Sequence, residues 1–343
     1  MSRMLKRIGW AWVLIAGGLV SSLPVRAGDM ADLVEAVGLA ELTATFDEAK
    51  VDRILGAYGS AIADPAERAA AATLVTMSMV HDWALDDPEV TAKMLMGWEN
   101  PDVETDGIIE MPLARPVGIM RVKLIGGHEA LRQDKELMAV LDVALGEEVL
   151  TGYGLRPRDV SGPTAADRTV IYSHSSLAHV KQLIGLMASE GLKGRVMIAP
   201  KVAAFVFREG WGERPTWLNK LGEHVHVAQG PEMLVHFELA SPDDRQRFDA
   251  LVERYAKKDE ADETGNLVRS WWQPFYFAET EAEGYASISQ VTLYGDNVEA
   301  SLLMLPEREE KVRAYFAPMD WEMKVNTIWV NAAFHRFLKG DYK

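Results

Sequence analysis

The stretch 223-EHVHVAQGPEMLVHFELASP-242 begins the part of the chain in which strands and helices alternate most clearly. Side chains alternate between the two faces of a β-strand. In residues 232–239 the odd-numbered side chains are Met, Val, Phe and Leu, whereas the even-numbered ones include His236 and two glutamates. This alternation predicts a strand with one buried apolar face and one polar face.

A second short strand is expected just upstream, over residues 223–227. The sequence Ala-Gln-Gly-Pro at 228–231 is typical of a tight turn, so we expect the two strands to pair as a hairpin. If Val225 and Val227 join the apolar core, the polar residues of both strands lie on the same outer face.

This hairpin would bring three histidines together. His224 and His226 would share the outer face with His236, and directly opposed residues of paired strands lie about 5 Å apart. Three imidazoles can bind Zn²⁺ or Cu²⁺, and Glu238 or water would complete the coordination shell. The alternative interpretation is a polar sheet face that is solvated or covered by a helix. Both interpretations stay open at this stage.

The elements that follow predict an α+β fold. Ser241 and Pro242 are typical of a helix start, and Gly295-Asp296-Asn297 is typical of a hairpin turn. Together with the strand at 232–239, the order is β-α-β-β-α-β, the ferredoxin-like plan. The remaining elements of this plan are expected at 242–258, 285–305, 306–318 and 322–330.

A βαβ unit is expected upstream, with strands at 168–174 and 193–200 around a helix at 175–192. The segments 196–207 and 326–337 both place an alanine pair and a phenylalanine after a strand, which suggests a duplicated βαβ unit. His174 and His179 flank the start of the helix. Their spacing of five predicts that they lie on different helix faces.

The first part of the chain is expected to be mostly helical. Asp64-Pro65 and Asp87-Pro88 each combine an N-cap residue with a proline at the first helical position. Residues 151–167 are rich in Gly, Pro and charge, which is typical of a linker. The expected division is a signal peptide at 1–27, a helical domain at 28–150, the linker, and an α+β part at 168–343.

The N-terminus has the three parts of a secretory signal. Arg3, Lys6 and Arg7 precede a compact apolar run, and small residues follow Pro24 before a cleavage position after Ala27. The run is shorter than the roughly 20 residues that span a bilayer. The chain has no cysteine, which excludes disulfides, thiolate ligands and lipoprotein processing. We expect a periplasmic or secreted protein without a transmembrane segment after cleavage.

The chain is strongly acidic. It carries 36 basic and 51 acidic residues, and residues 1–27 hold four of the basic ones and no acidic one. The remaining chain therefore has 32 basic and 51 acidic residues, a net charge of −19. Such a charge repels nucleic acid. Near-half apolar content predicts a globular protein.

An aromatic insertion at 259–285 is the candidate ligand surface. Connections of this length are uncommon unless they bind something or are disordered, and the many aromatic residues argue against disorder. Aromatic rings with polar tips suit glycans, peptides or protein partners. The alternative is that the rings cover the open sheet face. The candidate ligand-binding residues, including those of the loop at 208–217, are Trp211, Trp217, Trp271, Trp272 and Tyr276.

Three functional classes remain open. The leading one is an exported, non-enzymatic protein that binds a small molecule, peptide, glycan or envelope protein. The second is a metal-dependent hydrolase with the three histidines as zinc or copper ligands and Glu238 or Glu223 as general base. The third is a cell-envelope assembly factor. No dinucleotide-binding, Walker or H-E-x-x-H motif is present.

Overall fold

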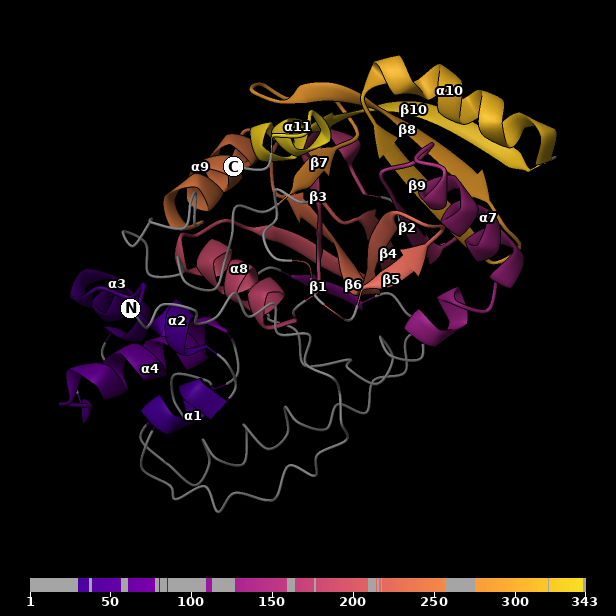
Figure 1. Cartoon of the computed structure of the whole chain (residues 1–343). Helices are drawn as coiled ribbons and strands as arrows, with labels where there is room; N and C mark the ends of the chain where they lie inside the picture. The colour runs from indigo at the N-terminus through magenta and orange to yellow at the C-terminus, as the bar shows by residue number, and fades with distance from the viewer. Residues whose placement is uncertain are drawn as a thin grey trace, which may run out of the picture.

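The computed structural model combines a closed β-barrel with surrounding helices (Figure 1). It describes residues 30–36, 39–56, 61–77, 80, 85, 109–112, 127–158, 164–175, 177–208, 214, 216, 218–256, 275–319 and 321–341. Within these ranges, no helix has the length and apolar character needed to cross a membrane.

Eight antiparallel strands form the barrel wall in the order β4-β2-β9-β8-β10-β7-β3-β6, and β6 pairs back with β4. Closure gives every strand a neighbour on both sides and removes the exposed edges of an open sheet. The barrel strands are β2 (Gly152–Pro157), β3 (Thr169–His174), β4 (Gly194–Val206), β6 (Val225–Leu239), β7 (Tyr276–Ala278), β8 (Ala286–Tyr294), β9 (Val298–Met304) and β10 (Glu322–Val330).

Two short strands extend the wall. β1 (Ile109–Pro112) pairs with the first half of β4, and β5 (Asn219–Leu221) pairs with the start of β6. The pairing of β4 with β6 is long and runs from Gly194↔Leu239 to Val206↔Val227. The shorter strands pair with one or the other of these two strands or extend the wall beyond them.

The expected ferredoxin-like fold is wrong. That fold is an open sheet, and it would place β6 between β10 and β9. Here β6 lies between β3 and β4, and the sheet closes because β10 pairs with β7 and β2 pairs with β9. The two segments considered as duplicates also differ. Residues 199–206 continue β4, whereas Ala332–Leu338 form a helix.

The expected hairpin at 223–239 is also wrong, because β6 runs without interruption from Val225 to Leu239. Gly230 and Pro231 pair with Ala203 and Val202 of β4 instead of forming a turn. Between the residues paired to β5 and those paired to β3, β4 is the one described strand that pairs with β6. A stretch that is paired on one side only tolerates proline.

Helices cover the outside of the barrel (Figure 1). α7 and α10 pack on one side of the wall, while α8 and α9 pack on the other. α11 follows β10 directly and packs Phe334 and Leu338 against the barrel's inner cluster. These helices are α7 (Lys135–Gly146), α8 (Leu177–Ser189), α9 (Asp244–Tyr255), α10 (Pro306–Phe316) and α11 (Ala332–Leu338), with 3₁₀ turns η3 (Ala166–Arg168) and η5 (Ala317–Met319).

The N-terminal helices pack beside α8 (Figure 1). They are α1 (Met30–Ala36), α2 (Ala40–Thr43), α3 (Glu48–Leu55) and α4 (Pro65–Thr76). The predicted start of α4 is confirmed, because the Asp64 carboxylate accepts hydrogen bonds from the backbone N–H groups of Ala66 and Glu67. The apolar residues of the N-terminal helices join the cluster formed by α8, α9 and the outer face of β3 and β6.

Other expectations have different outcomes. The stretch 151–167, expected as a linker, contains β2, a strand of the barrel wall. The βαβ elements expected between 168 and 200 are confirmed as β3, α8 and β4. The signal segment 1–27 and the helix expected after Asp87 lie outside the described residues.

Candidate functional site

The barrel has an apolar exterior and a partly polar interior. On β6 the side chains of odd number, such as Val235 and Phe237, belong to the clusters beneath the outer helices. Leu234 instead shares a cluster with Ile171, Phe277 and Ile288, which lie on β3, β7 and β8. Residues from strands on opposite sides of the wall meet in this way inside the barrel. The even-numbered face of β6 is therefore the interior face.

One end of the interior is framed by the three charged residues Arg168, Arg195 and Glu238, here called the barrel mouth. Arg168 donates from Nε and Nη2 to Oε1 of Glu238, at 3.2 and 2.7 Å. Arg195 donates from Nε to Oε2 at 2.9 Å, and its Nη2 also contacts that oxygen. The side chain of Glu238 is 7% exposed, whereas those of Arg168 and Arg195 are 38% and 43% exposed. The arginines thus present a positive surface to solvent.

These contacts determine the protonation state of Glu238. Burial, the largest single influence, raises its pKa. The hydrogen bonds and charges of Arg168 and Arg195 together outweigh burial and hold the pKa below its ordinary value. Glu238 is therefore ionised at neutral pH. The three side chains together carry a net charge of +1.

A second polar group spans the interior farther along the barrel. Nζ of Lys201 on β4 donates to Oε2 of Glu232 at 2.9 Å and to Oγ of Ser173 at 3.0 Å. Arg156 of β2 forms an ion pair with Glu299 of β9. These cations are matched by carboxylates, as buried charges require.

His236 is the exception in this interior. It lies two residues before Glu238 on the same face of β6, between Ile171 of β3 and Met197 of β4 in the strand register. It is 7% exposed, and its Nδ1 has no hydrogen-bond partner among the described residues. Buried polar atoms in folded proteins are nearly always hydrogen-bonded, and an unpaired one requires an explanation.

The electrostatic environment keeps His236 neutral. Burial first, and the positive charge of Arg156 second, lower its pKa to about 4. At neutral pH the imidazole is therefore uncharged. The neutral ring has one hydrogen-bond donor and one acceptor, and Nδ1 is the ring nitrogen that lacks a partner among the described residues.

The three histidines of the expected metal site are not brought together. His224 lies in the turn before β6 with its side chain 89% exposed, and His226 and His236 are ten positions apart on one strand. That separation corresponds to roughly 33 Å along a strand. Across the described ranges, no group of three or more His, Cys, Asp or Glu residues could hold a metal ion.

His174 and His179 are closer than their spacing predicted. Nε2 of His174 and Nδ1 of His179 are 3.0 Å apart, and the rings meet edge to face. The expectation that they lie apart is wrong, because His174 ends β3 and is not part of α8, so helical spacing does not apply to the pair.

The candidate aromatic residues are only partly within the described structure. Trp211, Trp217, Trp271 and Trp272 lie outside the described residues. Tyr276 is buried on β7 against Phe248 of α9. Its neighbour Phe277 points into the barrel and pairs with Ile171, which in turn pairs with His236. The C-terminal end of the insertion thus forms β7, which β3 separates from the strand that carries His236.

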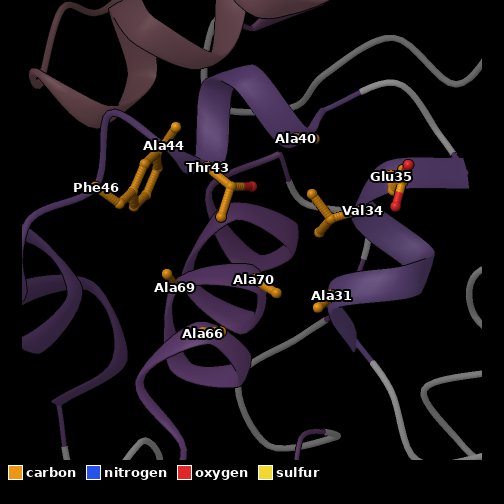
Figure 2. A pocket seen from close by; sticks show the side chains of 10 residues that line it. All are labelled: Ala31, Val34, Glu35, Ala40, Thr43, Ala44, Phe46, Ala66, Ala69 and Ala70. Atoms are coloured by element: carbon orange, nitrogen blue, oxygen red, sulfur yellow. The ribbon is translucent and has the colours of Figure 1, made fainter. Parts of the chain in front are cut away.

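A separate hollow lies among the N-terminal helices (Figure 2). It has a volume of about 420 Å³, and small apolar side chains of α1, α2 and α4 line most of it. Its polar groups are few. Glu35 lies in its wall, and the Thr43 hydroxyl already bonds to Leu39 and Thr73. Specific ligand sites combine apolar walls with converging polar groups, and this hollow has few polar groups.

No protein-family model, curated protein or solved structure matches this chain. The candidate site therefore stands on geometry and electrostatics alone.

Sequence reasoning missed most of the charged residues of this site. Arg195 and Lys201 have odd numbers, whereas the apolar residues Val196, Ile198 and Val202 have even numbers. The alternation of side chains along a strand could therefore have placed both cations on a polar face. It does not indicate that the sheet closes into a barrel with this face inside.

Proposed function

We propose that the protein is a non-enzymatic binding protein whose small-molecule ligand enters the barrel mouth and hydrogen-bonds to His236. The observation that carries this proposal is the buried Nδ1 of His236, which has no hydrogen-bond partner in the part of the chain that the structure describes. An unpaired buried polar atom costs about 1–3 kcal/mol. A ligand that hydrogen-bonds to this nitrogen would recover that cost.

The surrounding interior supports binding rather than catalysis. Lys201 and Arg156 are held in ion pairs, and Glu238 is held by two arginines. These groups are suited to orient a polar ligand by hydrogen bonding. Some eight-stranded barrels hold one small ligand, whereas others are filled by side chains.

The test compares two histidine variants of the full chain. His236→Leu replaces the imidazole by an apolar side chain of similar size, and His224→Leu is the matched control on the exposed turn. The readouts are the thermal unfolding midpoint, with and without the small-molecule fraction of the native cells' extract, and native mass spectrometry of bound compounds. We expect the extract to stabilise the wild type and His224→Leu, but not His236→Leu.

Two results would contradict the proposal. One is a wild-type protein that the extract does not stabilise and that retains no small molecule in native mass spectrometry. The other is a His236→Leu protein that binds the same compound as strongly as the wild type does.

Export to the periplasm or exterior is part of the proposal and rests on the N-terminal sequence. The supporting experiment is intact-mass analysis of the protein expressed with its own N-terminus in a bacterial host, combined with cell fractionation. We expect the exported form to begin at Gly28. A cytoplasmic protein that retains residues 1–27 would overturn this part.

A further inference from the structure

Two histidines on the outside of the barrel face each other. His174 ends β3, His179 lies in the first turn of α8, and their Nε2 and Nδ1 atoms are 3.0 Å apart. Both residues are partly exposed. The alternation along β3 places His174 on the outer face with Tyr172, whereas Ile171 points inward. The pair is therefore separate from the proposed ligand contact at His236.

Two further polar residues belong to the same cluster. Gln182 follows His179 by three residues, so both lie on one face of α8. Its Nε2 donates to Oε2 of Glu41 on α2 at 2.9 Å. Gln182 is 4% exposed, and its Oε1 has no hydrogen-bond partner within the described part of the chain. A buried acceptor of this kind requires an explanation, and a bound ion is one.

The electrostatics of the cluster favour a cation. Burial lowers the pKa of His179 and outweighs the opposing effect of the Glu41 charge. The imidazole of His179 is therefore uncharged at neutral pH, and the neutral imidazole is the form that binds metal ions. The carboxylate of Glu41 adds a negative charge close to it.

The distance between the two nitrogens suits one metal geometry. Bonds from a metal ion to imidazole nitrogen are about 2.0–2.1 Å long, so two such nitrogens 3.0 Å apart form an angle of about 91–97° at the ion. This angle is close to the right angle of tetragonal Cu²⁺ sites and smaller than the tetrahedral angle of structural Zn²⁺ sites. The pair therefore fits Cu²⁺ better than Zn²⁺.

We infer that Nε2 of His174 and Nδ1 of His179 bind one Cu²⁺ ion, with Oε1 of Gln182 and water as the remaining ligands. Across the described ranges no third His, Cys, Asp or Glu completes a metal site, which leaves the amide oxygen as the protein's further donor. Glu41 holds that amide through the hydrogen bond to Nε2. This inference goes beyond the proposed binding function and does not depend on it.

Copper binding changes the hydrogen bond between the two rings. The ring that donates in the His174–His179 contact moves its proton to its other nitrogen, so that both facing nitrogens carry a lone pair. Both rings then rotate to direct these lone pairs at the ion. The step needs no oxidant or reductant.

The experiment titrates the metal-free full chain with CuCl₂ in the presence of glycine, which competes for weak surface sites. Isothermal titration calorimetry gives the affinity and stoichiometry. Electron paramagnetic resonance of the frozen complex counts the imidazole nitrogens bound to Cu²⁺. We expect one ion per chain with two imidazole nitrogens. This spectrum tests the assignment without any variant that has to fold.

Variants of single residues test the assignment of the ligands. His174→Gln and His179→Gln should each weaken Cu²⁺ binding at least tenfold and leave one imidazole nitrogen in the spectrum. Gln182→Leu removes Oε1 and should weaken binding about tenfold. His224→Gln is the matched control, because His224 is exposed in the turn before β6. The unfolding midpoint without copper shows whether each variant is folded.

Three results would overturn the inference. The first is a wild type that binds no Cu²⁺ against glycine, and the second is a spectrum without two imidazole nitrogens. The third is an affinity that His174→Gln and His179→Gln leave unchanged or that His224→Gln lowers equally, because the copper would then be adventitious. None of these results affects the extract experiment on His236, so the two proposals fail separately.

Discussion

The side chain of Lys201 on β4 crosses directly over Gly154 on β2. A β-carbon added at Gly154 would lie 2.6 Å from Cε of Lys201. Nζ of Lys201 donates to Glu232, its partner in the β4–β6 register, and to Ser173 on β3, the strand beyond β6. The absence of a side chain on one strand thus positions a charged group inside the barrel.

Gly154→Ala should displace Lys201 and break its bonds to Ser173 and Glu232. We expect the free energy of unfolding, measured by urea denaturation, to fall by about 1–3 kcal/mol. Lys201→Ala removes the clashing atoms, so the double variant should lose less stability than the sum of the two single variants. Strictly additive losses would show that the two residues are not coupled.

Glu190→Gln should loosen the N-terminal helices from the barrel. Nζ of the buried Lys50 on α3 donates to Glu190, just after α8, at 2.7 Å. Neutralising the partner of a buried cation costs about 3–5 kcal/mol, and partial exposure of Glu190 places the expected loss near the lower end. Limited proteolysis should cut the region of α1 to α4 sooner in this variant.

The control for Glu190→Gln is Asp52→Asn, which breaks the exposed pair with Arg68. Exposed pairs contribute at most about 1 kcal/mol, so this variant should behave nearly as the wild type does. Equal sensitivity of both variants to protease would contradict a specific role for the buried pair.

Tyr276→Ala should act on stability and not on ligand binding. The ring packs at right angles to Phe248 of α9, with centroids 5.3 Å apart, and its hydroxyl bonds to Asp249. Removing a buried aromatic side chain costs about 3–5 kcal/mol. Calorimetry should show a lower unfolding temperature with unchanged ligand affinity at temperatures where the variant is folded. A loss of affinity at unchanged stability would instead make Tyr276 a ligand contact, as the sequence suggested.

Strand parity was the most reliable guide from the sequence. Val235 and Phe237 do lie on the apolar face of β6, and His226, His236 and Glu238 share the opposite face. Parity survives because the strand is regular over its whole length. The same parity predicted the wrong environment, since a polar barrel interior and a solvated outer face give the same alternation.

Barrel closure could not be predicted from local patterns. It depends on β10 pairing with β7 and on β2 pairing with β9, and the β2–β9 pair joins residues more than a hundred positions apart. The turn signal at Gly230-Pro231 misled because pairing with the long strand β4 outweighs a local turn preference. Local propensity is a weak prior when tertiary pairing competes with it.

The stability of the protein should fall between neutral pH and pH 4 because of His236. An unfolded histidine takes up its proton near pH 6.5, whereas burial and Arg156 lower the pKa of His236 to about 4. Between these values the unfolded state binds more protons, so acid favours unfolding. His236 therefore contributes to the free energy of unfolding above pH 6.5. This contribution, about 3 kcal/mol, is lost as the pH falls from 6.5 to 4.

His236→Leu should remove this pH-dependent loss. The variant is also relieved of an unpaired buried nitrogen, so at pH 7 it should be at least as stable as the wild type. Urea denaturation from pH 7 to pH 4 measures the free energy of unfolding of both proteins. The other titrating groups are the same in both proteins, so their effects cancel in the difference. His224→Leu, on the exposed turn, should follow the wild-type curve. Parallel curves for the wild type and His236→Leu would show that burial does not hold the imidazole neutral. The case for an unsatisfied buried group at His236 would then fail.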